Sequence, residues 1–435
     1  MFKKVANILI AVVLIAIMVS MSTSAAIPTG VTEQPTNTMK TNGNGGKTDV
    51  GTWMVTYNNE EMWADNFGSK FPINYRALLP DGTYGIQDSS NVEHIDFMLK
   101  EIADAKIDFI IFDETNGGFT EKVPYGWFGG EKNEGNRYIV DNARLTCERI
   151  AKWNANNEWQ IRYAMAIGTY DYICGGAPMG LIVEYQAEAI YKDFVENKTY
   201  GKDYYTFDGK PLLILFDWAS DPLEKWERYA DDRTYGDKFI ARSAQVGNVG
   251  TYGWYTNYGT VIHDEVELVC PGHNTAGETP ASILRDNGNY YKKSWETILN
   301  NPLPRIIVVA ALNDYNEQTG VWPADSSKCD EKIEEKWTDE TGKLNPTMYW
   351  DMTKEGIKLV RIFNDEIDGK FASKVFDLGE NAEFDLAVFI ALNPMYVVIA
   401  VAAVVVIAGV VVTIVLVIKK KKAKNLIEES VEEND

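Results

Sequence analysis

Residues 305–318 read RIIVVAALNDYNEQ, and this stretch decides the fold class of the chain. Its first half is an uninterrupted apolar run, which is typical of a strand buried on both faces of a parallel sheet. Its second half changes abruptly to Asn, Asp and Glu, as expected where a buried strand ends at solvent. In α/β barrels the carboxyl ends of the strands carry the chemistry, so this stretch predicts both a fold and a site.

Shorter apolar runs recur along the chain and alternate with amphipathic segments. Strands are predicted at residues 52–57, 106–113, 161–167, 212–217, 239–243 and 266–270. Helices are predicted at residues 92–102, 138–153, 182–194, 282–299 and 349–363, the first behind a capping box of Ser90 and Glu93. The pattern predicts an α/β fold, a (β/α)8 TIM barrel over residues 51–368. A doubly wound sheet is the alternative, disfavoured because no Gly-rich turn follows the first strand.

The amino-terminal end has the features of an export signal. Lys3 and Lys4 precede an apolar run at 5–19, and small residues follow at 24–26, so residues 1–26 are predicted to be a signal peptide. An uncleaved anchor is the alternative, although the run is short for a span. Residues 27–50 are rich in Thr, Asn and Gly and are predicted to form a flexible linker.

The carboxyl-terminal part has the features of a membrane anchor. Residues 395–418 carry no charge and are long enough to cross a bilayer as a transmembrane helix, after a juxtamembrane segment at 369–394. Lysines at 419–422 and 424 follow at once and predict a cytoplasmic tail at 419–435. The large domain is therefore expected outside the cell, on a single-pass cell-membrane protein.

Composition excludes several classes of function. The chain has 42 Lys and Arg against 63 Asp and Glu, a net charge of −21, which argues against a nucleic-acid partner. The four cysteines (147, 174, 270 and 329) show no metal-ligand spacing, and disulfides or buried free thiols are both open. With three histidines, no H-E-x-x-H and no G-x-S-x-G, metalloprotease and serine-hydrolase chemistry is not supported. No cofactor or metal is predicted, although an acidic barrel mouth could hold Ca²⁺.

Carboxylates, amides and aromatic rings recur where predicted strands end. Such groups suit sugars, because rings stack on pyranose faces and paired carboxylates supply acid and base for cleaving an acetal. Asp314 and Glu317 are the candidate catalytic pair, though acids three apart are also common by chance in an acidic protein. For the aromatic candidates core packing is an equal alternative, and Asp113 could instead cap a turn. The candidate substrate-binding residues are Tyr57, Asp113, Glu114, Asn116, Trp254, Tyr255, Asn257, Tyr258, Asn313 and Tyr315.

Residues 285–324 (RDNGNYYKKSWETILNNPLPRIIVVAALNDYNEQTGVWPA) resemble the final segment of the glycoside hydrolase family 71 and 99 group. Those families carry Arg-x-x-Gly-x-Tyr-Tyr at a helix entry. A strand follows, and then Asn-Glu-Trp-x-Glu-Gly-Thr in the endo-α-mannosidases or Asn-Asp-Tyr-Gly-Glu-Ser in the α-1,3-glucanases. The less specific likeness extends over roughly residues 51–365. Gln318 departs from the Gly or Ser of the families, and Asn316 departs from the mannosidase pattern.

The resemblance implies a barrel that cleaves α-linked polysaccharide, with Glu317 as the general acid and Asp314 as the partner carboxylate. In the mannosidase family the partner is thought to deprotonate the sugar's own 2-hydroxyl, whereas the glucanases use a base and a water. Two other readings remain. A surface protein on the same barrel could bind glycans without turnover, and an adhesive module is disfavoured because the chain has no internal repeat.

Overall fold

The structure is a computed structural model that describes residues 47–65, 71–120, 137–169, 179–217, 226, 232–245, 254, 265–274, 283–301 and 303–364. The predicted signal peptide, the predicted membrane span at 395–418 and the predicted segments on either side of it lie outside these residues. Within the described ranges, no helix combines the length and apolar character needed to cross a bilayer.

The main sheet contains seven strands whose mutual pairings are all parallel. They are β1 (Asp49–Val55), β4 (Phe109–Glu114), β5 (Arg162–Gly168), β7 (Lys210–Asp217), β8 (Ile240–Gln245), β9 (Val266–Val269) and β10 (Ile306–Val309). A two-residue strand, β6 (Thr206–Phe207), pairs antiparallel with the start of β7. Side chains of β1, β4, β5, β9 and β10 are buried almost throughout, which explains their continuous apolar sequences.

The order of these strands is cyclic. The sheet runs β8-β7-β5-β4-β1-β10-β9, so the first strand lies between the second and the last parallel strands. This order excludes a doubly wound sheet, in which the first and last strands do not pair. The described residues contain no pairing between β8 and β9, so the predicted eight-stranded closed barrel takes the form of a curled sheet of seven parallel strands.

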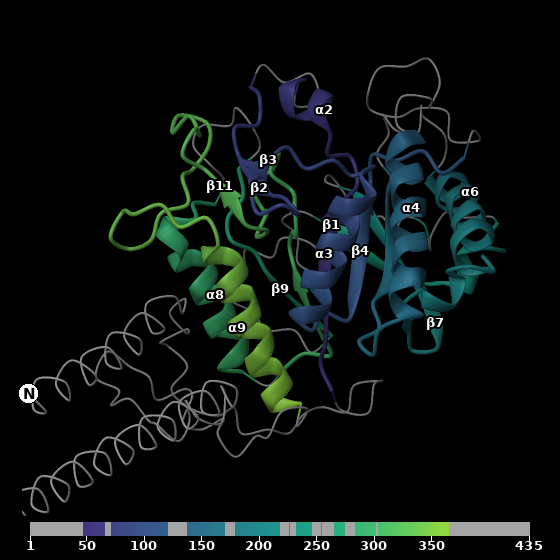
Figure 1. The fold of residues 1–435 in the computed structure, drawn as a ribbon. Helices are drawn as coiled ribbons and strands as arrows, with labels where there is room; N and C mark the ends of the chain where they lie inside the picture. The colour runs from purple at the N-terminus through teal and green to yellow at the C-terminus, as the bar shows by residue number, and fades with distance from the viewer. Residues whose placement is uncertain are drawn as a thin grey trace, which may run out of the picture. The chain divides into compact units, whose positions relative to one another are not determined.

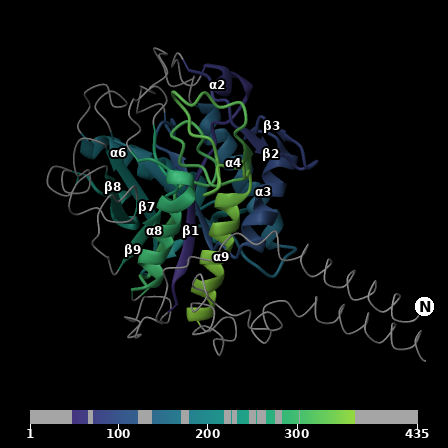
Figure 2. The same cartoon turned by 90° about the vertical axis from the view of Figure 1, so that its left-hand side faces the viewer.

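Helices follow the strands and cover the outside of the curled sheet (Figures 1 and 2). They are α3 (Val92–Asp104), α4 (Arg137–Asn154), α6 (Met179–Ile190) with a π-helical turn at Tyr191–Val195, α8 (Asn289–Leu299) and α9 (Met348–Phe363). Short 3-10 turns lie at Gly201–Asp203, Gly236–Lys238 and Asp286–Gly288. Where α8 meets α9, Gly356 packs against the indole of Trp295, and a Cβ there would lie 2.4 Å from the ring.

Two helix starts differ from the sequence prediction. The N-cap of α3 is Asn91, whose side chain accepts from the backbone N–H groups of Glu93 and His94, so the predicted capping box was wrong by one residue. Ser90 instead donates to Asp88 at 2.7 Å. The helix α8 begins seven residues later than predicted, because the backbone at Asp286–Gly288 has positive φ angles that interrupt a helix.

The two ends of the described domain are joined. The Thr48 N–H donates to the Asn364 side chain at 2.9 Å, and the Asn364 amide donates back to the Thr48 carbonyl at 3.0 Å. Thr48 is buried and β1 begins at Asp49, so the domain starts inside the segment predicted as linker. Cys147, Cys270 and Cys329 are buried free thiols, and Cys174 lies outside the described residues.

A smaller layer lies at the end of the sheet where β1 finishes (Figure 1). It contains the helix α2 (Glu60–Asp65) and an antiparallel sheet of β11 (Ala324–Asp325), β2 (Arg76–Leu78) and β3 (Tyr84–Gly85). Both the α2 segment and β11 follow carboxyl ends of parallel strands, β1 and β10. This layer therefore belongs to the face of the barrel that carries the predicted site.

Candidate active site

The loop that bears the two candidate catalytic acids is held tightly in place. It leaves β10 through a cis peptide between Ala310 and Ala311 and returns so that the Gly320 N–H donates to the Asp314 carbonyl at 2.7 Å. The buried guanidinium of Arg285 donates to the carbonyls of Gln318 and Gly320 at 2.5 and 3.0 Å. These bonds fix the loop before any substrate arrives, which is what a preorganised site requires.

Gln318 explains one departure from the family pattern. Its φ is +53°, a left-handed conformation that favours glycine, and the resembling families have Gly or Ser here. Its side chain compensates with three hydrogen bonds. It accepts from the Tyr75 hydroxyl and the Glu335 N–H, both at 3.0 Å, and donates to the Ile333 carbonyl at 2.7 Å. The glutamine thus fastens the loop to neighbouring segments and leaves the acids in place.

Asp314 is a buried acid with two donors on one oxygen. The Tyr57 hydroxyl reaches its Oδ1 at 3.2 Å and the Glu317 backbone N–H reaches the same atom at 3.0 Å. Burial, followed by the nearby charge of Glu317, raises the pKa of Asp314 to about 7. An acid with such a pKa can exchange a proton near neutrality, which suits acid and base catalysis.

Glu317 is the more accessible member of the pair, with 32% of its side chain exposed. His273 Nε2 lies 3.4 Å from its Oε2, and the Asn274 N–H donates to its carbonyl at 3.0 Å. Both contacts come from the segment 271–274 that follows β9. This segment directly follows the strand predicted at 266–270, but the sequence prediction did not count His273 among the site residues. A histidine directly after a buried strand was the available signal.

Asp113 joins the pair from the end of β4. Its Oδ1 accepts from the hydroxyl and N–H of Thr115 at 2.7 and 3.2 Å, so it caps a turn as the alternative reading allowed. Burial raises its pKa to about 6, and the charge of Glu317 contributes to the shift. Asp113 in turn contributes to the raised pKa of Asp314 and of Tyr57. Three carboxyl groups and one phenol therefore share one electrostatic environment.

Glu114, next in sequence, faces the opposite side of the strand. Alternation along β4 directs it toward α4, where its Oε1 accepts from the Thr56 hydroxyl at 2.6 Å. The same hydroxyl reaches the Ile139 carbonyl of α4 at 3.0 Å. Burial raises the pKa of Glu114 to about 8. The structure therefore separates Glu114 from the carboxylates it was predicted to join.

Asn313 has a positioning task. Its side chain is fully buried and bonds to both backbone groups of Val55, accepting from the N–H at 3.0 Å and donating to the carbonyl at 3.1 Å. Its amide also donates to Gln87 at 3.0 Å. The amide thereby ties the catalytic loop to the end of β1, so that Tyr57 and Asp314 meet. No side-chain atom of Asn313 is left to face a substrate.

Two predicted aromatic residues lie in the core. Tyr315 packs against Trp63, Tyr75 and Trp337 and donates to the Trp322 carbonyl. Trp254 is buried at the opposite end of the sheet, because its indole donates to Glu265, just before β9, and contacts Phe207 of β6. Core packing was the equal alternative, and the structure selects it for both.

The remaining candidates divide into two groups. Asn116 is partly buried just past β4, at the same end of the sheet as Asp113. Tyr255, Asn257 and Tyr258 lie outside the described residues. Within the described ranges, no group of three or more His, Cys, Asp or Glu side chains is arranged to hold a metal ion.

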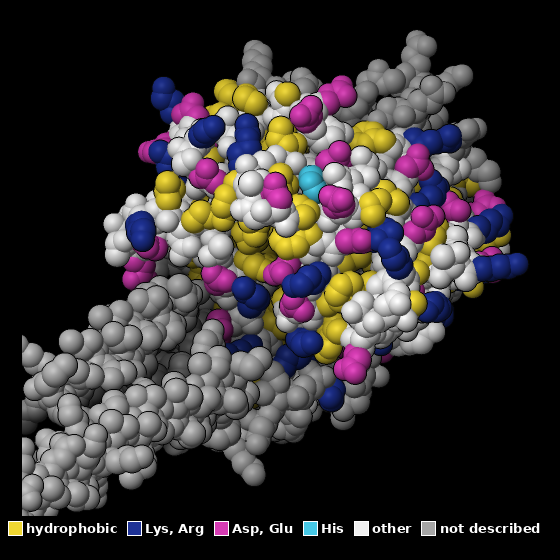
Figure 3. All heavy atoms as spheres, viewed as in Figure 1, with side chains coloured by type: hydrophobic (Ala, Val, Ile, Leu, Met, Phe, Trp, Pro, Cys, Tyr) yellow, Lys and Arg dark blue, Asp and Glu magenta, His cyan; other side chains and the backbone are white. Residues whose placement is uncertain are grey.

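On the face shown in Figure 3, acidic, basic and apolar side chains are interspersed, and the described side chains form no continuous basic surface in that view. A nucleic-acid site would require such a surface. The prediction that nucleic acid is not a partner rests on the acidic composition of the chain.

No family model matches the chain, and no curated protein matches it. Similar solved structures include a glycoside hydrolase family 99 endo-α-mannosidase from Bacteroides thetaiotaomicron. It aligns with a TM-score of 0.48 and 14% identity over 73% of this chain and 98% of that chain. A glycoside hydrolase-like protein aligns with a TM-score of 0.45 and 12% identity over 76% and 99%. The mannosidase belongs to family 99, one of the two families that residues 285–324 resemble. At such identities and TM-scores, the chemistry has to be argued from this chain's own side chains.

Proposed function

We propose that the protein is a glycoside hydrolase that cleaves α-linked polysaccharide of the α-mannan or α-1,3-glucan type. The observation that carries the proposal is the pairing of buried Asp314 with the more exposed Glu317 on one rigid loop. Acetal cleavage needs one carboxyl group that gives a proton and a second that takes one, and this loop supplies both.

Glu317 is the proposed general acid. Its partly exposed carboxyl can reach a glycosidic oxygen, donate its proton there and allow the bond from the anomeric carbon to break. His273 and the Asn274 N–H hold the residue in position from the neighbouring strand end. The role agrees with the match of Glu317 to the acid in the family motif.

Asp314 is the proposed base. Both donors that reach it from the described residues bind Oδ1, which leaves Oδ2 for the reacting hydroxyl. In its ionised form the carboxylate takes a proton from the nucleophile, which is either water or the sugar's own 2-hydroxyl. The pair then has the proton on Asp314 and the charge on Glu317, and exchange with solvent restores the starting state.

The test uses the full-length chain in detergent or a lipid nanodisc. It is incubated with α-mannan, α-1,3-glucan and a β-linked glucan as control, and released reducing ends are measured. We expect release from an α-linked polymer only, and its loss in Glu317→Gln. Full activity in that variant would exclude Glu317, and binding of glycan without release would support the non-catalytic alternative.

We further propose that the enzyme acts at the cell surface, tethered by residues 395–418. The supporting features are the uncharged length of that segment and the lysines that follow it. Protease added to intact cells should then remove the large domain, whereas a tag on the carboxyl-terminal tail should stay protected. Protection of both parts would contradict this placement.

A further inference from the structure

A hollow of about 520 Å³ opens between α2, the start of α3 and the small sheet of β2, β3 and β11. Pockets that hold small ligands typically measure about 300–1,000 Å³. Its walls include Glu60, Arg76, Ile86, Asp88, His94 and Lys328. None of the candidate catalytic residues lines it, so it is a feature separate from the acid pair.

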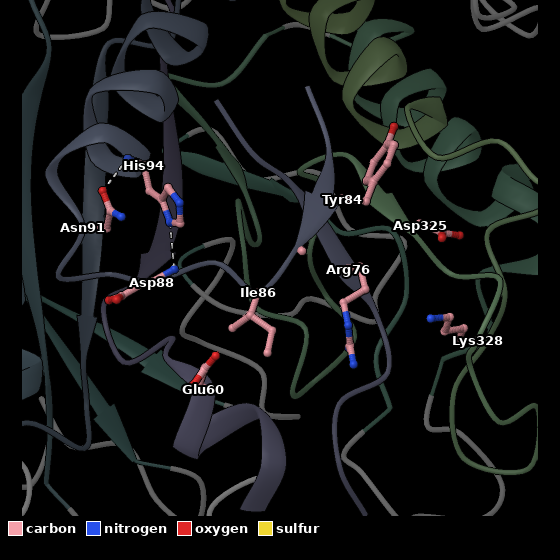
Figure 4. A pocket seen from close by; sticks show the side chains of 10 residues that line it. Glu60, Arg76, Tyr84, Ile86, Asp88, Asn91, His94, Asp325 and Lys328 are labelled. Atoms are coloured by element: carbon pink, nitrogen blue, oxygen red, sulfur yellow. Dashed lines mark hydrogen bonds between the residues drawn. The ribbon is translucent and has the colours of Figure 1, made fainter. Parts of the chain in front are cut away.

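The hollow is lined by both hydrogen-bond donors, such as Arg76 and Lys328, and acceptors, such as Glu60. In Figure 4 Glu60 and Arg76 project into the same space beside Ile86, and Lys328 reaches toward it from the far side. Within the described residues, neither Arg76 nor Lys328 forms an ion pair. The Arg76 guanidinium is nevertheless fixed, since it donates to the carbonyls of Ile73 and Tyr75 at 3.1 and 2.7 Å.

The charges favour a neutral, hydroxyl-rich ligand over an ion. Three carboxylates, Glu60, Asp88 and Asp325, line the hollow together with two cations. The carboxylates oppose an anion, and the two cations oppose a metal or an amine. Sugar hydroxyls both donate and accept, so a mixed lining can satisfy them without an unpaired charge. The apolar surface of Ile86 gives the carbon face of a sugar a place to pack.

Residues beside the hollow contact the loop that carries Asp314 and Glu317. Arg76 follows Tyr75, whose hydroxyl bonds to Gln318, the neighbour of the proposed acid. The Arg76 guanidinium also lies 5.8 Å from the ring of Trp63, whose indole donates to Asn58. The first contact leads to the catalytic loop, and the second leads to Asn58 just past the carboxyl end of β1. A polymer held at the hollow would therefore be held on the same face as Asp314 and Glu317.

We propose that this hollow is a distal subsite that binds sugar units of a long glycan whose cleavage occurs at the acid pair. The inference rests on the proposed function. It places a neutral oligosaccharide segment against Glu60, Arg76 and Lys328 while another part of the same chain occupies the catalytic mouth. The subsite therefore strengthens the binding of a polymer that reaches from the hollow to the acid pair. It adds no affinity for a substrate too short to reach both.

The test compares a polymer with a disaccharide in the full-length protein. Glu60→Gln with Lys328→Ala alters two exposed side chains that the catalytic loop does not use. We expect KM for the polymer to rise about three- to tenfold, because each hydrogen bond to a hydroxyl contributes about 0.5–1.5 kcal/mol. The value of kcat and the kinetics on the disaccharide should stay unchanged. Lys332→Ala, also on an exposed lysine but outside the hollow, is the matched control.

An equal KM for the polymer in the double variant and the wild type would overturn the subsite. Failure of the proposed function is a different result, in which the wild type releases no reducing ends from any glycan. In that case calorimetry with the same oligosaccharides decides the matter. Binding that weakens in the double variant supports the subsite, and absent or unaltered binding overturns it.

Discussion

His273 Nε2 lies 3.4 Å from Glu317 Oε2, and the next residue, Asn274, donates its backbone N–H to the Glu317 carbonyl. One strand end therefore holds the proposed acid by both its side chain and its backbone. His273→Ala removes the side-chain contact, and we expect kcat to fall about tenfold, which corresponds to about 1.4 kcal/mol of transition-state stabilisation.

His273→Gln is the matched control, because its side-chain amide can place an N–H₂ group near Glu317 where Nε2 lies, and it should retain most of the activity. Steady-state kinetics of the two variants on one α-linked substrate provide the comparison. Equal activity in His273→Ala and the wild type would show that the contact has no part in catalysis.

The Tyr57 hydroxyl stabilises the charged form of Asp314. Its hydrogen bond favours the ionised carboxylate and so lowers a pKa that burial raises to about 7. Tyr57→Phe removes the donor, so the pKa of Asp314 should rise. If Asp314 is the base, the acidic limb of kcat/KM against pH should move to higher pH. Tyr235→Phe, on the turn before β8, is the control because it lies outside both the acid pair and the hollow. An acidic limb that stays unchanged in Tyr57→Phe would show that the protonation of Asp314 does not control kcat/KM.

Glu114 should make the fold less stable as the pH rises. Burial raises its pKa from 4.5 to about 8, so its contribution to stability is present below 4.5 and is lost as the pH rises through 8. Glu114→Gln keeps an acceptor for Thr56 and removes the ionisation. We expect this variant to gain about 1–3 kcal/mol at pH 7 and to show a weaker pH dependence of unfolding between pH 5 and pH 8.

Chemical denaturation at several pH values measures this effect. Asp104→Asn, an exposed acid near the end of α3, is the control and should leave the profile unchanged. A lower free energy of unfolding in Glu114→Gln than in the wild type at pH 7 would show that the ionisable carboxyl group stabilises the fold.

Gln318 combines an unfavourable backbone with favourable side-chain bonds. Gln318→Ala loses the three hydrogen bonds and keeps the left-handed backbone, whereas Gln318→Gly loses the bonds but relieves the backbone. We expect both variants to be destabilised, with Gly less affected than Ala by about 1 kcal/mol. Thermal unfolding of the pair measures the difference. Equal stability of the two variants would mean that the φ angle carries no cost.

Much of the scaffold could be predicted because parallel strands are buried on both faces. Continuous apolar runs such as residues 306–309 locate the strands, and the acids directly after them locate the mouth. The strand order could only be inferred by analogy with barrels, since pairing depends on contacts far apart in sequence. The start of α8 was missed although Asp286, Asn287 and Gly288 are the residue types that most readily adopt positive φ angles. Their signal was outweighed by the apolar pattern on both sides.

Side-chain direction limited the prediction of the site. Asp113 and Glu114 are adjacent acids, and sequence alone does not say which of the two alternating faces is the interior. Asn313 and Tyr315 were placed in the mouth because they follow a predicted strand. In the structure Asn313 bonds to the backbone of Val55, and Tyr315 packs in the aromatic core. Trp254 was predicted at the mouth but lies at the opposite end of the sheet, because its aromatic side chain suits a buried site at either end.

The most direct test of the account compares Glu317→Gln and Asp314→Asn on two substrates of the full-length protein. One substrate is the α-linked polysaccharide, and the other is an aryl α-glycoside whose leaving group needs no protonation. We predict that Glu317→Gln lowers kcat/KM on the polysaccharide about 100- to 10,000-fold, because that reaction needs a general acid. On the aryl glycoside, whose leaving group needs no protonation, kcat/KM should stay close to that of the wild type. Asp314→Asn should lose activity on both. If both variants cleave the polysaccharide at the wild-type rate, the proposed roles are contradicted. If Asp314→Asn is slow only on the polysaccharide and Glu317→Gln is slow on both substrates, Asp314 is the acid.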